Sequence, residues 1–178
     1  NAENWEGISY EIWDAVAQMA DIPYMIIDSG LDSNTVYKQI QEDTLQDGIS
    51  AIIPMYTTQD KEDLLVFSTP IVVDKFVVVG LHGSPNIFAI YDLTNTRVGI
   101  VEGLESTNLI KTYLPNKQYV TGFASNDALV DSLLARNIDY IVLSESEFEQ
   151  YFYEQHNYDL TIKYEISDVQ SAIAFYNN

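Results

Sequence analysis

The chain has 178 residues, enough for one large domain or two small lobes with a sizeable core. Hydrophobic residues make up 47% and charged residues 20%, a balance that argues against disorder, collagen-like repeats and coiled coil. The formal net charge of −19, from 27 acidic and 8 basic residues, excludes nucleic acids and anionic lipid headgroups as favoured partners.

The residue types also limit the chemistry. Without cysteine, the chain has no disulfide, thiol nucleophile or thiolate metal site. Its longest apolar stretch, Phe76–Leu81, is far shorter than the roughly 20 residues that cross a bilayer. We therefore expect no direct membrane insertion by this segment.

Apolar spacing in the first part of the chain alternates between helical and strand-like periods. In chain order, it predicts a helix over residues 8–19, a strand at Tyr24–Asp28, a helix capped by Ser33, and strands at Ile49–Met55 and Phe76–Gly80. Pro23 ends the first helix, and the segment Phe67–Ile71 interrupts the alternation.

The second part repeats the alternation, which favours two α/β lobes. The predicted elements are strand Arg97–Val101, helix Ser106–Tyr113, strand Gln118–Gly122, helix Asn126–Arg136, strand Tyr140–Leu143, helix Glu145–Tyr153, and two strand-like runs, Leu160–Ile166 and Ser171–Tyr176. Ser125 is the expected cap of the helix after it, and Ser144 and Glu147 have capping-box spacing.

No motif in the chain points to catalysis. The two histidines, His82 and His156, are far apart, and neither has a second ligand three or four residues away, so no metal site is expected. Phosphate-binding glycine loops and the nucleophile elbow are absent from the sequence. Glu145, Glu147 and Glu149 suit the positive end of a helix dipole. We expect a non-enzymatic domain without a cofactor.

Several short motifs occur in a fixed order. They are GISYEI at residues 7–12, DGISAIIP at 47–54, TTQDK at 57–61, FSTPI at 67–71, DLTNTRVGIVEG at 92–103 and NIDYI at 137–141. In this order they resemble the patterns G-F-x-x-D-L, G-x-x-D-A-I, T-x-x-R, F-S-x-P-Y/I, D-L-x-G-x-x-V-G-V-x-x-G and G-x-x-D-A-V of the family 3 extracytoplasmic solute-binding proteins. The resemblance covers essentially the whole chain.

This resemblance implies an α/β clamshell of the type 2 periplasmic-binding-protein fold, which closes on a small solute held between two lobes. The implied division is lobe 1 over residues 1–75, a hinge over 76–91, lobe 2 over 92–162 and a return crossover over 163–178. Compared with the family, the chain lacks the first strand and the closing C-terminal helices.

Four polar anchors of the family's amino-acid pocket have changed, at five positions of this chain. Lys61 stands where the carboxylate-clamping Arg is usual, and a lysine cannot form the same bidentate fork. Ser144 replaces the Asp that holds a ligand ammonium. Pro54 and Tyr56 replace small hydroxyl residues, and Gly103 is followed by Leu104 in place of Thr.

The resemblance places the ligand-binding residues on both lobes, the first four of the set in lobe 1 and the last four in lobe 2. The predicted set is Tyr56, Thr57, Thr58, Lys61, Gly103, Glu105, Ser106 and Ser144. Structural alternatives stay open for three of them: Lys61 as a surface lysine, Ser144 as a helix cap, and Thr58 as the cap of a short turn.

The expected function is an extracytoplasmic ligand-sensing domain of a membrane signalling protein, such as a sensor histidine kinase or a diguanylate cyclase. We expect it to be periplasmic or at the cell surface, tethered through a membrane segment outside this sequence. Its partners would be a small polar solute and flanking domains of the same receptor. The alternatives are the solute-binding component of an uptake transporter and an interaction module with a vestigial cleft.

Overall fold

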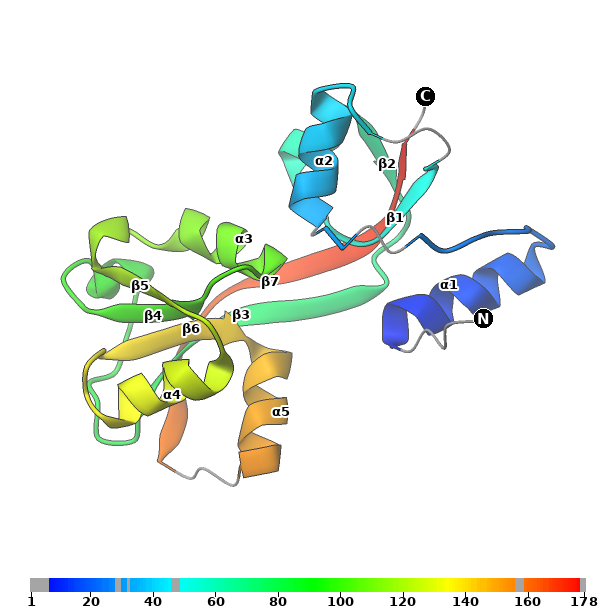
Figure 1. The fold of residues 1–178 in the computed structure, drawn as a ribbon. Helices are drawn as coiled ribbons and strands as arrows, with labels where there is room; N and C mark the ends of the chain where they lie inside the picture. Colours follow the sequence, from blue (N-terminus) through cyan, green and yellow to red (C-terminus); the bar gives the residue numbers. More distant parts are fainter. Residues whose placement is uncertain (1–6, 28–29, 32, 46–48, 156–158, 177–178) are drawn as a thin grey trace. The chain divides into compact units, whose positions relative to one another are not determined.

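The computed structural model describes residues 7–27, 30–31, 33–45, 49–155 and 159–176 (Figure 1). The chain forms two compact units. Unit 1 combines the described residues up to Val73 with those from Gln170 onward, and unit 2 is the continuous segment Asp74–Val169. The predicted lobe and hinge boundaries stay predictions.

Unit 1 packs two helices against short strands. Its elements are α1 (Ile8–Met19), α2 (Ser33–Gln41), β1 (Ala51–Tyr56), the 3-10 turn η1 (Gln59–Lys61), β2 (Leu65–Phe67) and the end of β7 (Leu160–Tyr176). Strands β1 and β2 both pair antiparallel with β7, with Ala51 opposite Phe175 and Leu65 opposite Tyr176. Tyr37, Ile40, Met55 and others form the apolar core between α2 and these strands.

Helix α1 ends as its apolar spacing predicts. Asp21 takes a left-handed conformation (φ 54°), and Ile22 N donates to Ala17 O at 2.9 Å. Asp21 N donates to Gln18 O at 3.3 Å, which completes the two bonds of a Schellman motif. Pro23 then prevents the helix from continuing.

The strand expected at Tyr24–Asp28 is wrong for its described part, residues 24–27, which belong to no strand. The apolar, β-favouring run is present, but no strand of the described sheet lies beside this segment. Met25 is 81% exposed as a result. A strand needs a hydrogen-bonded neighbour as well as the right side chains.

Unit 2 has three layers, with helices on both faces of a mixed sheet (Figure 1). The strands run in the order β7-β3-β6-β4-β5. The elements are β3 (Val72–Leu81), η2 (Ile90–Leu93), β4 (Val98–Val101), α3 (Glu105–Tyr113), η3 (Lys117–Tyr119), β5 (Val120–Phe123), α4 (Asn126–Leu134), β6 (Tyr140–Ser144), α5 (Glu145–Gln155) and β7.

The sheet residues of unit 2 alternate between its two helical faces. Val77, Val79, Ile141 and Leu143 share a core with α4 and α5. Phe76 points to the other face, where its ring meets Tyr113 of α3 edge-on at 6.2 Å. Buried β-branched residues on both faces explain the continuous apolar run at 76–80.

Both predicted helix caps in unit 2 are confirmed. Ser125 Oγ accepts a hydrogen bond from Ala128 N at 3.3 Å. In the capping box of α5, Glu147 N donates to Ser144 Oγ at 3.2 Å and Ser144 N donates to a Glu147 carboxylate oxygen at 2.9 Å. The two strand-like runs at the end of the chain are one 17-residue strand, β7.

Candidate functional site

The predicted ligand residues fall into two groups, one in each unit. Tyr56, Thr57, Thr58 and Lys61 belong to unit 1, and Gly103, Glu105, Ser106 and Ser144 belong to unit 2. Each group follows directly from the end of a strand, so the local backbone of each is fixed by the sheet.

In the unit 1 group, Lys61 is a buried cation. Its side chain lies in η1 and is only 4% exposed. The ammonium Nζ donates to Tyr56 O at 3.1 Å and lies 5.9 Å from the centre of the Tyr37 ring. The alternative that Lys61 is a surface lysine is therefore wrong.

Thr57 and Thr58 differ in how their hydroxyls are used. Thr57 Oγ1 donates to Gln170 O at 3.1 Å, which ties the end of β1 to β7. Thr58 has an extended backbone before η1, but its side chain makes no capping bond. The alternative that Thr58 caps this turn is therefore wrong.

The Thr58 hydroxyl is the unusual polar atom of this group. Its Oγ1 is buried and has no hydrogen-bond partner among the described residues. A buried hydroxyl without a partner costs about 1–3 kcal/mol, so such atoms call for an explanation in native proteins. A ligand acceptor would supply the missing partner, and the role of Thr58 as a ligand residue stays a prediction.

The unit 2 group lies at the carboxyl ends of two adjacent parallel strands. Strands β4 and β6 pair with Val98 opposite Tyr140, so Val101 and Ser144 end at the same sheet edge. The chain leaves β4 through α3 to β5 on one side, then returns through α4 to β6 on the other. Ligands of open α/β sheets bind at such a reversal of strand order.

Gly103 and Ser106 occupy the start of α3 at this edge. Gly103 has φ 86°, a backbone conformation that favours glycine. An added Cβ would meet no atom within 4 Å, so the conformation, and not a lack of space, accounts for the glycine. Ser106 is 7% exposed, and its hydroxyl makes no hydrogen bond to a described residue. Glu105 begins α3, but its side chain lies outside the described part.

Ser144 is fully engaged in structural hydrogen bonds. Besides the capping box, its Oγ lies 3.2 Å from Ser146 Oγ. Ser146 in turn donates from both its backbone N and its Oγ to the Asp74 carboxylate. The capping alternative for Ser144 is confirmed, and its role in ligand binding stays a prediction.

Two ion pairs lie at opposite ends of β4, and only the first is at the sheet edge of the predicted ligand residues. Lys111 Nζ lies 3.0 Å from Glu102 Oε1, which neutralises a carboxylate beside the start of α3. Arg97 pairs with Asp139 through two side-chain bonds of 2.6 and 3.1 Å. This hydrogen bonding from Arg97 lowers the pKa of the Asp139 carboxyl.

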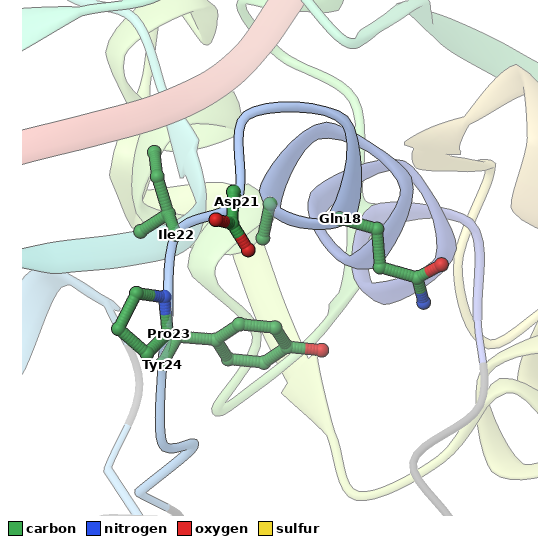
Figure 2. Close-up of a pocket in the computed structure, with 6 residues that line it drawn as sticks. Gln18, Asp21, Ile22, Pro23 and Tyr24 are labelled. Carbon is green, nitrogen blue, oxygen red and sulfur yellow. The ribbon is translucent and has the colours of Figure 1, made fainter.

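The structure also has a hollow that the sequence did not predict. It has a volume of about 460 Å³ and lies where α1 turns into the following segment (Figure 2). Its walls come from Ala17, Gln18, Asp21, Ile22, Pro23 and Tyr24. The Tyr24 hydroxyl donates a hydrogen bond to the Asp14 carboxylate, and this bond raises the pKa of Tyr24. Only the helix-ending Pro23 marked this region in the sequence.

No metal centre is indicated by the described residues, which contain no group of three or more His, Asp or Glu side chains placed to hold an ion. His82 is exposed in its turn, and His156 lies outside the described part. Among the described helices, none is both long and apolar enough to cross a membrane.

Comparison with solved structures identifies the fold. The ligand-binding core of GluR0 in complex with L-glutamate matches with a TM-score of 0.74 at 16% identity, over 100% of this chain and 79% of that one. ArtJ, the arginine-, lysine-, histidine-binding protein of Geobacillus stearothermophilus, matches with a TM-score of 0.68 at 16% identity, over 97% and 73%.

The arginine-bound form of a truncated ArgBP from T. maritima gives a TM-score of 0.67 at 20% identity, over 98% of this chain and 79% of that one. These likenesses confirm the α/β fold of the type 2 periplasmic binding proteins. No protein-family model and no curated protein sequence matches the chain.

Proposed function

We propose that this chain is an extracytoplasmic domain that binds a small polar solute and reports it to a membrane signalling protein. GluR0, ArtJ and ArgBP share this fold and are described with amino-acid ligands, which supports solute binding. The domain would bind and release its solute without covalent chemistry.

The observation that carries the proposal is the Thr58 hydroxyl, which is buried without a partner among the described residues. It stands three residues before the buried ammonium of Lys61, in the segment that follows β1. Both groups can donate hydrogen bonds to an acceptor. Burying the Thr58 hydroxyl without a described partner costs free energy, which a bound solute would offset.

These donors favour an anionic or neutral polar solute over a cation. Exposed carboxylates at Asp60, Glu62 and Asp63 surround Lys61 in the sequence and oppose an anion. Solvent and salt screen them, whereas a charge at a buried site such as Lys61 acts through a lower effective dielectric. In unit 2, the pairing of Glu102 with Lys111 removes another repulsive charge.

Standard amino acids should bind weakly. The lysine at position 61 lacks the bidentate fork of arginine, and the ammonium-binding position is a capping serine. Two charge-assisted contacts are worth roughly 1.5–3 kcal/mol each, so their loss removes about two to four decades of affinity. We expect dissociation constants above about 100 µM for the twenty amino acids.

The test is a ligand screen by thermal shift followed by calorimetry, with amino acids, small carboxylic acids and neutral polar compounds. A compound that stabilises the wild type should lose at least about tenfold in affinity in Lys61→Ala. Lys117→Ala is the matched control, because Lys117 is exposed in η3 of unit 2. A ligand that is insensitive to Lys61→Ala would refute this site.

Solute binding should also bias a hinge movement of the two units, since a ligand shifts a conformational equilibrium by its differential affinity for the two states. Small-angle scattering with and without the identified ligand measures this as a smaller radius of gyration. The full-length gene then separates the roles. Kinase or cyclase segments would support a sensor, and a neighbouring permease would support a transporter.

A further inference from the structure

Two serine hydroxyls and one carboxylate form a continuous series of hydrogen bonds at the start of α5. Ser144 Oγ lies 3.2 Å from Ser146 Oγ, and Ser146 Oγ donates to Asp74 Oδ2. Strands β3 and β6 are antiparallel with Phe76 opposite Ser144, which sets Asp74 just beyond the end of β6. All three residues belong to unit 2, and Ser144 and Ser146 are called the hydroxyl pair here.

The direction of these bonds follows from the number of protons. The Asp74 carboxylate can only accept at neutral pH, so the single hydroxyl proton of Ser146 is committed to it. Ser146 Oγ must then accept in its contact with Ser144, which commits the Ser144 proton as well. Neither hydroxyl keeps a proton for a solute, so the hydroxyl pair can only accept a hydrogen bond.

The two hydroxyls differ in their access to a solute. Ser144 is only 4% exposed, and its Oγ also accepts from Glu147 N at 3.2 Å. Ser146 is exposed, and among the described residues its Oγ accepts only from Ser144, which leaves one of its two lone pairs open. Ser146 therefore presents the accessible acceptor, two residues beyond the predicted ligand residue Ser144.

The backbone donors beside the hydroxyl pair are also in use. Ser146 N donates to Asp74 Oδ1 at 3.3 Å, and Glu147 N donates to Ser144 Oγ. These are amides that the start of a helix otherwise offers to an acceptor. Their engagement leaves Ser146 Oγ to interact with a donor.

The nearby charges favour a donor as well. Lys75 Nζ lies 3.4 Å from a Glu145 carboxylate oxygen and 3.3 Å from a Glu165 carboxylate oxygen, so this cation is held by two carboxylates. Lys75 N donates to Asp74 Oδ1 at 2.8 Å. A solute oxygen placed against Ser146 would face these carboxylates, whereas the hydrogen of an O–H or N–H group would be attracted.

We propose that Ser146 accepts a hydrogen bond from an O–H or N–H group of the solute, and that Asp74 is the positioning residue that commits the Ser146 proton. The inference rests on the proposed function and narrows its solute class. The solute carries a donor for Ser146 besides the acceptor group that suits Thr58 and Lys61. Neither Asp74 nor Ser146 belongs to the predicted ligand set.

The experiment compares L-lactate with pyruvate as probes. The two have the same charge and the same heavy atoms, but lactate carries a hydroxyl where pyruvate carries a keto oxygen. Repulsion from neighbouring carboxylates therefore cancels in the ratio of their dissociation constants. We expect lactate to bind at least about fivefold more tightly than pyruvate, because the keto oxygen has no proton for Ser146. Titrations followed by NMR at the Ser146 amide measure both constants.

Two variants test the hydrogen-bond series. Asparagine can donate to Ser146 Oγ, which frees the Ser146 proton, so Asp74→Asn should reduce the preference for lactate to within about twofold. Ser146→Ala should reduce it equally by removing the acceptor, and alanine suits the first turn of a helix. The matched controls are Asp131→Asn and Ser132→Ala in α4, which should keep the wild-type preference.

Three results would overturn the proposal. Equal affinities of the wild type for lactate and pyruvate would show that the hydroxyl pair donates as readily as it accepts. A preference that survives in Asp74→Asn or in Ser146→Ala would show that the changed residue only supports the fold. Titrations in which neither probe shifts the Ser146 amide would show that no donor binds there. A screened compound that depends on Lys61 would then leave the proposed function standing, so the two failures are distinguishable.

Discussion

Thr57 and Thr58 are adjacent residues whose hydroxyls have opposite surroundings. The Thr57 hydroxyl donates to Gln170 O at 3.1 Å, whereas the Thr58 hydroxyl is buried without a partner among the described residues. Replacing a satisfied hydroxyl with a methyl group loses a hydrogen bond, and replacing an unsatisfied one removes a desolvation cost. The same Thr→Val change should therefore have opposite signs at the two positions.

We expect Thr58→Val to raise the free energy of unfolding by about 1 kcal/mol and Thr57→Val to lower it by about 1 kcal/mol. Valine fits the extended backbone of Thr58 (φ −136°, ψ 146°). Urea denaturation of both variants measures the two changes in the free energy of unfolding. If Thr58→Val is destabilising, the hydroxyl has a partner in solution. A stabilised Thr58→Val that also binds solute less well would tie the unsatisfied group to ligand binding.

The ion pair of Asp139 with Arg97 makes the stability of the protein depend on pH. The pKa of the Asp139 carboxyl is lowered from the ordinary value of 3.8, chiefly by hydrogen bonding from the Arg97 side chain. Because the folded pKa lies below the unfolded one, the pair contributes stability above the unfolded value and loses it as pH falls through the folded value. Both side chains are at least 38% exposed, so the contribution is modest.

The variant Asp139→Asn should therefore be less stable than the wild type at neutral pH. The difference between them should shrink progressively below about pH 4. Urea midpoints across a pH series measure it, with Asp131→Asn on the exposed side of α4 as the control. A difference that is constant with pH would mean that the Arg97 pair does not govern it.

At the site, the sequence predicted a set of ligand-binding residues, but not which of their side chains are buried. The position of Lys61 in a polar turn, between Asp60 and Glu62, is typical of a surface residue. Its ammonium lies 5.9 Å from the centre of the Tyr37 ring, 24 positions earlier in the chain, and the Tyr37 hydroxyl donates to Asp60 O at 2.7 Å. The residues next to Lys61 in the sequence do not indicate a contact with Tyr37, so the burial of the ammonium could not be predicted.

Among the elements, β4 shows how closely the sheet packs on α4. A Cβ added to Gly99 would lie 2.5 Å from methyl carbons of both Leu129 and Ile138, which are themselves buried. By contrast, a Cβ added to Gly83 would meet no atom within 4 Å, and that residue has no left-handed backbone. The two glycines separate the effect of packing from the effect of the substitution itself.

Gly99→Ala should lower the free energy of unfolding by about 1–3 kcal/mol, because the extra methyl overpacks this layer. Gly83→Ala should change it by less than about 0.5 kcal/mol. Thermal denaturation followed by circular dichroism measures both. Equal stabilities would show that α4 moves away from the sheet without cost.

Sequence patterns predicted the elements of unit 2 well because its signals are local. Ser144 and Glu147 stand three residues apart in the chain and bond each other in the structure. The failures are non-local. Residues 24–27 have a strand pattern but no neighbouring strand, and β2 is three residues long, too short to carry a period. Its existence depends on pairing with β7 over a hundred residues away.

For the whole molecule, the net charge of −19 sets the response to salt. The ion pairs among the described residues use few of the 27 acidic side chains, so repulsion between the remaining carboxylates is the larger electrostatic effect. Salt screens this repulsion more than it weakens the pairs, because both are exposed and the repulsive contacts are more numerous.

The melting temperature should therefore rise as sodium chloride is raised from about 10 mM to about 200 mM, where the Debye length falls from about 30 Å to under 10 Å. Scanning calorimetry at matched pH measures the change. A melting temperature that falls with salt would instead show that attractive pairs dominate.

Strand β7 also determines when the chain can fold during its synthesis. In the described sheet, β1 and β2 take their partners from the last residues of β7, whereas the strands of unit 2 from β3 to β6 find partners among themselves. On the ribosome, residues 51–67 emerge long before residues 170–176. The middle of the chain is thus the first part able to form its sheet. Strands β1 and β2 can pair only after the last residues of β7 have been synthesised.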